Sequence, residues 1–245
     1  MEKYVVITAG GKGERMQSSV PKQLMEIAGK PILLHVFDRF LAYSDNLHFV
    51  LVLPKAHLGT WKSICHRYHL TTPHTVTENG PTRFHSVKNG LRHVPLNVLV
   101  AIHDGARPLV SVETISTAFF FAEKMGNAVP VTTITESVRI KDKALSTPLP
   151  RDRVKVVQTP QVFHSAQIKK AYELSYQESF TDDATVLEAS GESIYLTEGN
   201  AENIKVTSPP DRLIAEALLS KNTRASSGSP PDPADRNISP DPFSP

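Results

Sequence analysis

The stretch YVVITAGGKGERM, residues 4–16, joins an apolar run to a glycine-rich turn. Residues 4–9 are mostly apolar and β-branched, which predicts a strand buried on both faces of a sheet. Gly10, Gly11 and Gly13 follow at once, so backbone N–H groups there can approach a ligand closely. A helix after such a turn would direct its N-terminus at the same point. The stretch therefore predicts the first strand and the first ligand-binding turn of an α/β domain.

The rest of the chain continues this alternation. Further short apolar runs at 47–54, 98–104 and 128–134 predict strands, and between them apolar residues recur at helical spacing over 32–41, 84–94 and 115–122. Strands that alternate with helices form mostly parallel sheets covered on both faces. We expect a doubly wound α/β fold, with one domain over residues 1–220.

Composition excludes several classes of protein. The 245 residues include 27 Lys and Arg against 25 Asp and Glu, so the net charge of +2 argues against a nucleic-acid-binding protein. Cys65 is the only cysteine and sits in a helical pattern, which excludes an internal disulfide and favours an inert buried thiol. No signal-peptide pattern and no apolar run of about 20 residues is present, so we expect a cytoplasmic chain with no membrane contact.

The second half departs from the strand–helix pattern. Residues 135–160 alternate short β-like pieces with prolines and predict an arm or hairpin that leaves the sheet. We then expect a helix over 165–178 capped by Ser165, a short helix from 181 stopped by Gly191, strands at 193–199 and 203–207, and a last helix that opens at Ser208 and ends near Ser220. Pro, Ser, Asp and Gly dominate residues 221–245, which predicts a disordered tail.

The glycine-rich turn fits neither of two common phosphate loops. A Walker loop needs Gly-Lys-Ser/Thr where this chain has Gly13-Glu14, and a dinucleotide fingerprint needs a third Gly where Met16 stands. Two cations, Arg15 and Lys22, remain beside the turn and suit a polyphosphate whose charge grows in the transition state. A purely structural turn with solvated cations is an equally open interpretation.

HDGARP, residues 103–108, lies at the C-terminal end of a buried run. Ligands of open α/β sheets bind at that edge, so Asp104 could hold a divalent cation or a ribose hydroxyl, and Arg107 could hold a phosphate. The alternative is a salt-bridged turn. His103 stands one residue inside the strand, where a hydrogen-bonded structural histidine is expected rather than a catalytic base.

Weaker candidates lie elsewhere in the chain. In NGPTRFHSV, residues 79–87, Gly80 could approach a base and Ser86 could bond to it. Lys205 lies within an apolar run, which is unusual unless its ammonium has an anionic partner. Lys205 and Arg151 would make a clamp for a second phosphate, with Thr159 and Thr181 as further candidates. The acids of TDDA are explained by a helix cap.

Together these motifs resemble the 2-C-methyl-D-erythritol 4-phosphate cytidylyltransferases of the non-mevalonate isoprenoid pathway. The resemblance covers about residues 3–220 and rests on AGGKGERM, PKQ, HDGARP, TPQVF, TDDA and NIKVT in that order and spacing. It implies a nucleotidyltransferase fold of the Rossmann-like type with a protruding β-arm. It also implies transfer of a cytidylyl group from CTP to methylerythritol phosphate, with release of pyrophosphate.

The resemblance also implies a role for each matching residue. Ala9, Gly10 and Gly11 would line the nucleotide, Gly80 and Ser86 would contact cytosine, and Arg15 and Lys22 would stabilise the transition state. Asp104 and Arg107 would lie near the ribose, a Mg²⁺ ion held by Asp104, and the acceptor. Arg151 and Lys205 would position the acceptor phosphate, with Ser137, Thr159 and Thr181 close by. The arm would be exchanged in a homodimer, so that Arg151 serves the partner's site.

This chain departs from the family pattern in two places. Pro81 follows Gly80 where many members have Gly or Asp and removes one possible N–H donor, and Gly105 stands where Ala is usual. Arg153 competes with Arg151, which we prefer because it stands eight residues before Thr159. Two other functions stay open, a ribitol-5-phosphate cytidylyltransferase and a non-catalytic nucleotide-binding module, whereas TPQ and NIKVT disfavour a sugar-1-phosphate nucleotidylyltransferase.

Overall fold

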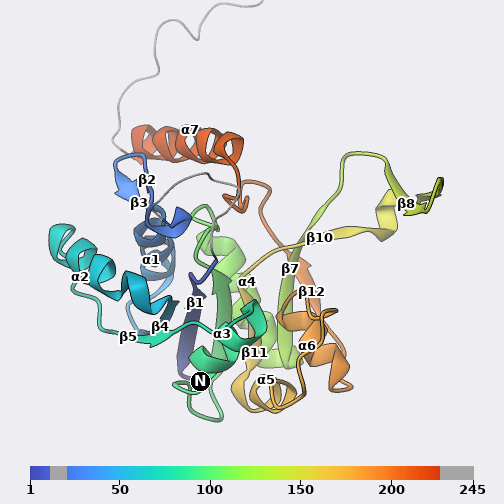
Figure 1. Ribbon diagram of the computed structural model, residues 1–245, viewed down its shortest axis with the longest axis horizontal. Helices are drawn as coiled ribbons and strands as arrows, with labels where there is room; N and C mark the ends of the chain where they lie inside the picture. The colour runs from blue at the N-terminus through green and yellow to red at the C-terminus, as the bar shows by residue number, and fades with distance from the viewer. Residues whose placement is uncertain (12–20, 227–245) are drawn as a thin grey trace, which may run out of the picture.

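The computed structural model describes residues 1–11 and 21–226, with side chains as far as Lys221, and its centre is one mixed sheet (Figure 1). The strand order is β10-β7-β11-β6-β1-β4-β5, and β12 pairs with β7. The strands are β1 (Lys3–Thr8), β4 (Leu47–Leu53), β5 (His74–Glu78), β6 (Leu99–Asp104), β7 (Asn127–Thr133), β10 (Lys155–Val157), β11 (Gln161–His164) and β12 (Leu196–Glu198).

The parallel strands of this sheet place several chain turns at one edge. β1 pairs in parallel with both β4 and β6, and β4 pairs in parallel with β5, whereas β10 and β11 run antiparallel to their neighbours. In this register Thr8 lies between Val52 and Asp104. Because parallel strands end at the same side, the segments that follow β1, β4, β5 and β6 converge there.

Alternating strand residues build a separate core on each face of the sheet. One face carries Val5, Ile7, Phe49 and Leu51, which pack against α1 (Ile32–Tyr43), α2 (Leu58–Arg67) and α4 (Val112–Met125). The other face carries Val6, Val50, Val52, Val100 and Ile102, which pack against α3 (Arg83–Leu91), α5 (Ser165–Ala171) and α6 (Asp183–Ala189). This two-sided burial explains why these strands read as continuous apolar runs.

Two further parts stand outside the sheet. Helix α7 (Pro209–Ser226) packs beside the small hairpin β2 (Glu26–Ile27) and β3 (Lys30–Pro31) through a third apolar cluster that contains Ile27, Val206 and Ala215. The predicted arm is a hairpin of β8 (Val138–Asp142) and β9 (Leu145–Leu149), which pair only with each other and project from the body (Figure 1). No helix of the described ranges is long and apolar enough to cross a membrane.

The predicted strands over 4–9, 47–54, 98–104 and 128–134 are confirmed, but one strand was missed and four local expectations are wrong. β5 was not expected; Ser165 does not cap its helix but accepts the Val98 N–H at 3.1 Å; and that helix, α5, ends at Ala171. Residues 203–207 form no strand, although Val206 N–H donates to Ala106 O at 2.8 Å. α7 runs six residues beyond the expected end at Ser220.

Candidate active site

A cavity of about 810 Å³ opens where the parallel strands end. Its lining comes from the segments after β1, β4, β5 and β6, from the start of α3, and from the extended segment before α7. The lining residues are Thr8, Gly10, Gly11, Pro21, Lys22, Gln23, Pro54, His57, Asn79, Gly80, Pro81, Thr82, Arg83, Ser86, Asp104, Ala106 and Lys205. The cavity therefore lies at the sheet edge where α/β proteins bind their ligands.

Two glycines let the backbone close around one end of this cavity. A Cβ built on Gly10 would stand 2.9 Å from Asn79 Cβ, and one on Gly80 would stand 2.9 Å from the His85 carbonyl carbon. Neither position has room for a side chain. Gly80 N–H donates to Ser86 Oγ at 3.1 Å, and Ser86 Oγ–H donates to the Thr82 carbonyl at 2.9 Å. The turn that follows β5 is thus fixed to the first turn of α3.

At the other end of the cavity, the Asp104 carboxylate is surrounded by three cationic side chains. Lys205 Nζ lies 2.9 Å from Asp104 Oδ2, Arg107 Nε lies 3.4 Å from the same oxygen, and Arg83 Nε lies 3.4 Å from Oδ1. Burial alone would raise the pKa of the Asp104 carboxyl, but these three cations outweigh it and hold that pKa well below its usual range. Asp104 is therefore ionised across the physiological range.

His103 lies beneath Asp104 as a neutral structural histidine. Its Nε2–H donates to the Arg107 carbonyl at 3.1 Å, and Nδ1 accepts from Thr159 Oγ1–H at 3.1 Å. Thr159 Oγ1 in turn accepts the Asp104 N–H at 3.1 Å. Full burial lowers the pKa of His103 to about 4. The sequence interpretation of His103 as structural is confirmed, because both ring nitrogens are bonded inside the protein.

Seven of the sequence-predicted site residues line the cavity. They are Gly10, Gly11, Lys22, Gly80, Ser86, Asp104 and Lys205. Lys22 is 9% exposed and begins a short 3-10 helix that follows Pro21. Arg15 lies outside the described residues, so its position relative to Lys22 stays a prediction. The anionic partner predicted for Lys205 is Asp104. The segment that carries Lys205 is not a strand.

Three other predicted residues lie beside the cavity and do not line it. Ala9 is 1% exposed and belongs to the core under β1. Arg107 directs Nη1 to the Asn203 carbonyl at 2.7 Å, so its guanidinium secures the segment that carries Lys205. The Thr159 hydroxyl is used by Asp104 and His103. Arg107 and Thr159 thus have partners within the protein, and the substrate contacts expected of these three residues stay predictions.

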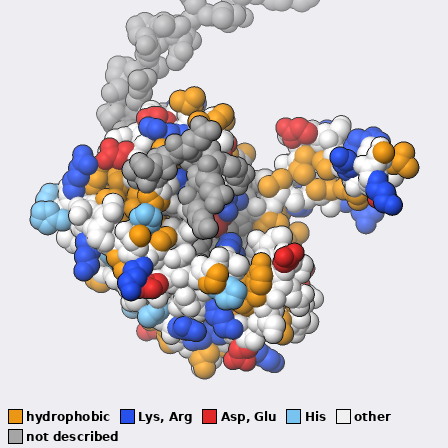
Figure 2. Space-filling view, viewed as in Figure 1, with side chains coloured by type: hydrophobic (Ala, Val, Ile, Leu, Met, Phe, Trp, Pro, Cys, Tyr) orange, Lys and Arg blue, Asp and Glu red, His pale blue; other side chains and the backbone are white. Residues whose placement is uncertain are grey.

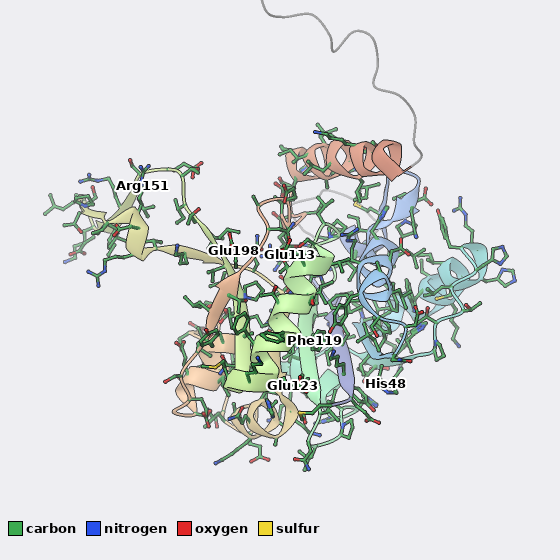
Figure 3. All side chains as sticks on the ribbon, turned by 180° about the vertical axis from the view of Figure 1, so that it is seen from behind. His48, Glu113, Phe119, Glu123, Arg151 and Glu198 are labelled. Atoms are coloured by element: carbon green, nitrogen blue, oxygen red, sulfur yellow. The ribbon has the colours of Figure 1, made fainter. Side chains whose placement is uncertain are left out.

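The remaining predicted residues lie away from the cavity. Ser137, Arg151 and Thr181 are exposed, and Arg151 Nη1 donates to the Thr135 carbonyl at 3.0 Å. Figure 3 shows Arg151 on the arm, separated from the body of the same chain. Lys and Arg side chains gather toward the end of this arm (Figure 2), whose basic residues are Arg139, Lys141, Lys143, Arg151, Arg153 and Lys155. Within one chain the arm does not supply the cavity.

Sequence reasoning missed Arg83, Gln23, His57 and Asn79 as cavity residues. Arg83 is the most consequential, because it bonds both Asp104 and the fully buried Asp183. The expected N-cap of α6 is Asp182, which forms a capping box, and the expected acid in the first turn is Asp183, which also pairs with Arg83. The sequence feature that could have indicated Arg83 is its place in NGPTRFHSV, three residues after Gly80.

Among the described lining residues, the Asp104 carboxylate is the group suited to a divalent cation. Asp104 is the single carboxylate among the described lining residues, and no cluster of three or more metal-ligating side chains occurs in the described ranges. Magnesium is commonly held by one or two carboxylates together with substrate phosphates. Asp104 fits this mode, as one protein ligand beside phosphate oxygens.

The sequence of this chain is similar to those of several named enzymes. A profile of the 2-C-methyl-D-erythritol 4-phosphate cytidylyltransferase family matches residues 3–221. The enzyme of that name from Phocaeicola vulgatus is 45% identical over 219 residues, which cover 89% of this chain and 100% of the relative. The enzyme from Porphyromonas gingivalis is also 45% identical over 219 residues, covering 89% and 98% of the two chains.

Solved structures agree with this similarity. The 4-diphosphocytidyl-2C-methyl-D-erythritol synthase of Anaerococcus prevotii has a TM-score of 0.77 at 27% identity and covers 89% of this chain and 96% of its own. The 2-C-methyl-D-erythritol 4-phosphate cytidylyltransferase of Thermus thermophilus has a TM-score of 0.71 at 28% identity and covers 90% and 100%. The shared architecture extends over nearly the whole described chain.

Proposed function

The chain belongs to the 2-C-methyl-D-erythritol 4-phosphate cytidylyltransferase family, and from this premise we propose which of its residues carry out the reaction and how. The enzyme transfers a cytidylyl group from CTP to 2-C-methyl-D-erythritol 4-phosphate in isoprenoid synthesis. An oxygen of the acceptor phosphate forms a bond to the α-phosphorus of CTP. The bond from that phosphorus to the bridging oxygen breaks, and pyrophosphate leaves.

CTP lies across the cavity from the turn after β5 to the turn after β1. The Gly80 turn and Ser86 take the base, because the glycine permits close approach and the serine hydroxyl is anchored beside it. Gly10, Gly11 and Lys22 take the triphosphate, where glycine backbone and a cationic side chain border the same space. The presence of Lys22 and Lys205 in one cavity with this glycine turn is the observation that carries the proposal.

The acceptor phosphate lies toward Lys205. A phosphate monoester is already anionic at neutral pH, so its oxygen attacks without a general base, which agrees with the structural role of His103. Catalysis then consists of alignment of the two substrates and neutralisation of charge by Lys22 and Arg15 as the pentavalent phosphorus forms. Lys205 holds the acceptor phosphate in line.

Mg²⁺ joins this site as a proposed cofactor. Asp104 would hold it together with oxygens of the triphosphate, since its carboxylate stays ionised and faces the cavity. When bound, the ion would neutralise phosphate charge that the protein's own cations leave unbalanced.

The arm supports a homodimer in which each chain completes the partner's site. The hairpin projects from its own body and carries Arg151 away from the cavity, while Lys205 is the exposed cation that the described residues place at the acceptor end. We assign Arg151 to the partner's acceptor phosphate. CTP is an intracellular nucleotide, so we place the reaction in the cytoplasm.

Lys22→Ala tests this mechanism through pyrophosphate release. We expect kcat to fall about 10²-fold or more while the KM for CTP changes much less, by analogy with the loss of one transition-state donor. Lys30→Ala is the matched control, because Lys30 pairs with Asp38 outside the cavity. Wild-type turnover in Lys22→Ala would remove Lys22 from the mechanism. Ribitol 5-phosphate in place of methylerythritol phosphate should give no pyrophosphate.

A further inference from the structure

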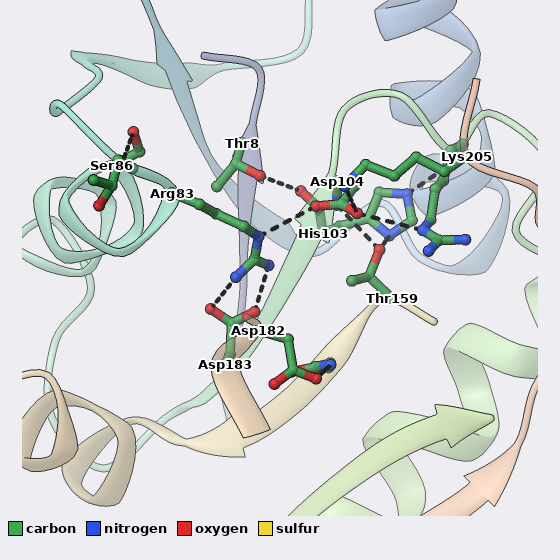
Figure 4. A network of polar contacts seen from close by, with 12 residues as sticks. Thr8, Arg83, Ser86, His103, Asp104, Thr159, Asp182, Asp183 and Lys205 are labelled. Carbon is green, nitrogen blue, oxygen red and sulfur yellow. Dashed lines mark hydrogen bonds and ion pairs between the residues drawn. The ribbon is translucent and has the colours of Figure 1, made fainter. Parts of the chain in front are cut away.

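A line of polar groups runs from the residue that follows α5, through the first turn of α6, to the cavity, and Figure 4 shows its part from Asp183 through Arg83 to Asp104. Tyr172 Oη–H donates to Asp183 Oδ1 at 2.6 Å. Arg83 Nη1 and Nη2 donate to the two oxygens of Asp183 at 2.9 and 2.6 Å, and Arg83 Nε faces Asp104 Oδ1 at 3.4 Å. Asp183 and Tyr172 are 0% and 2% exposed. The line therefore joins a rigid part of the core to the cavity wall.

The geometry of Arg83 leaves it little freedom. A guanidinium that makes two parallel bonds to one carboxylate is fixed in plane and direction, which a lysine ammonium cannot reproduce. Asp183 is itself held by Tyr172 and by the capped first turn of α6. The edge of the guanidinium that carries Nε consequently points at Asp104.

Arg83 determines in turn which way the Asp104 carboxylate faces. Because Oδ1 is directed to Arg83, Oδ2 is left to Lys205 at 2.9 Å and to Arg107 at 3.4 Å. We propose that Arg83 is a positioning residue, which orients Asp104 and thereby sets where the Lys205 ammonium stands for the acceptor phosphate. The inference rests on the proposed role of Lys205.

This arrangement also links the two ends of the cavity. Arg83 is the first residue of α3, and Thr82, whose side chain caps that helix, directly follows the Gly80–Pro81 turn. The segment from Gly80 to Arg83 therefore borders the proposed base site and is connected through Asp104 to Lys205.

Arg83→Lys, Tyr172→Phe and Lys205→Ala are compared with the wild type by steady-state kinetics for each substrate. We expect Arg83→Lys to raise the KM for methylerythritol phosphate about tenfold and to lower kcat, with the KM for CTP within about twofold. Tyr172→Phe should change the same constants in the same direction but less, because it loosens Asp183 without touching the cavity. If Arg83→Lys does not fold, Tyr172→Phe still tests the inference.

The control is Arg39→Lys, because Arg39 Nε donates to the Val110 carbonyl at 2.8 Å in a partly buried place outside the cavity. A rise confined to the KM for CTP would show that Arg83 acts on the nucleotide, directly or through a metal ion at Asp104, and not on the acceptor, and would overturn the inference. A lower melting temperature with unchanged KM and kcat in Arg83→Lys and Tyr172→Phe would also overturn the inference, because it would show that these residues only stabilise the fold. If Lys205→Ala keeps the wild-type KM for the acceptor, the proposed role of Lys205 fails instead.

Discussion

At the scale of single residues, charge around Asp104 explains the preference for anionic ligands. Two carboxylates, Asp104 and Asp183, face three cations, Arg83, Arg107 and Lys205, so the connected group has a net charge of +1. Lys22 lines the same cavity. Because the cations are fixed by protein contacts before substrate arrives, little reorganisation is needed when phosphate charge develops. The same contacts keep Asp104 from becoming an unpaired buried charge.

His103 gives the protein a defined loss of stability in acid. Its pKa is lowered from 6.5 to about 4 by burial, so between these values the unfolded chain binds a proton that the folded chain refuses. Stability is therefore full above pH 6.5 and falls toward pH 4, by about 1.4 kcal/mol per pH unit and about 3 kcal/mol in total. Urea unfolding of the wild type and of His103→Gln from pH 7.5 to 4.5 measures this.

The variant should be less stable throughout but should lack this part of the slope. His35, whose pKa burial also lowers, is present in both proteins, so the difference between them isolates His103. Parallel stability curves for the two proteins over this range would contradict the assignment.

The residue types in the sequence predicted part of the site, but they did not predict the part that depends on tertiary contacts. Lys205 in an apolar run required an anion, and Asp104 at a strand end suggested a ligand edge; both lie in the cavity. Arg83 and Asp183 stand 100 residues apart in sequence, so nothing local indicated their pairing. The use of the Thr159 hydroxyl and of Arg107 inside the protein likewise depends on segments that only the fold brings together.

At the scale of elements, the burial of a strand decides whether its sequence pattern predicts it. β1, β4 and β6 are covered on both faces and read as unbroken apolar runs, whereas β5 is an edge strand with only partly buried or exposed residues and gave no such signal. Residues 203–207 have an apolar alternation typical of a strand, but they pack against α7 and the turn after β6 without joining the sheet. Pattern alone does not separate these two environments.

The β8–β9 hairpin should be dispensable for folding. Val138 pairs with Leu149, so the two ends of the hairpin lie next to each other, and neither strand joins the main sheet. Replacing residues 138–149 with a short Gly-Ser link should leave the monomer's far-UV circular dichroism and cooperative unfolding close to those of the wild type. The same deletion should abolish dimer formation, measured by sedimentation velocity.

A matched control keeps the hairpin and changes its charge. Lys141→Ala with Lys143→Ala retains both strands and should remain dimeric if the hairpin backbone and its apolar residues carry the contact. Loss of cooperative unfolding on deletion would mean that the hairpin belongs to the folding unit.

At the scale of the whole molecule, the cavity and the arm are separate parts of one chain. The body supplies the nucleotide end and Lys205, and the arm carries Arg151 into solvent (Figures 1 and 3). The role that we propose for Arg151 therefore requires the arm to act on another chain. A two-fold dimer meets this requirement, because each arm then reaches the partner's cavity by the same contact.

Mixing two inactive variants tests this exchange directly. Arg151→Ala keeps Lys205, and Lys205→Ala keeps Arg151, so a mixed dimer contains one site with both side chains intact. Random exchange makes half of the dimers mixed, and we expect recovery of about a quarter of the wild-type activity per chain. As control, Arg151→Ala is mixed with a chain that carries both substitutions, which leaves no complete site in any dimer. Dimers that exchange subunits without regaining activity would show that each arm serves its own chain, and recovery with Arg153→Ala but not with Arg151→Ala would move the role to Arg153.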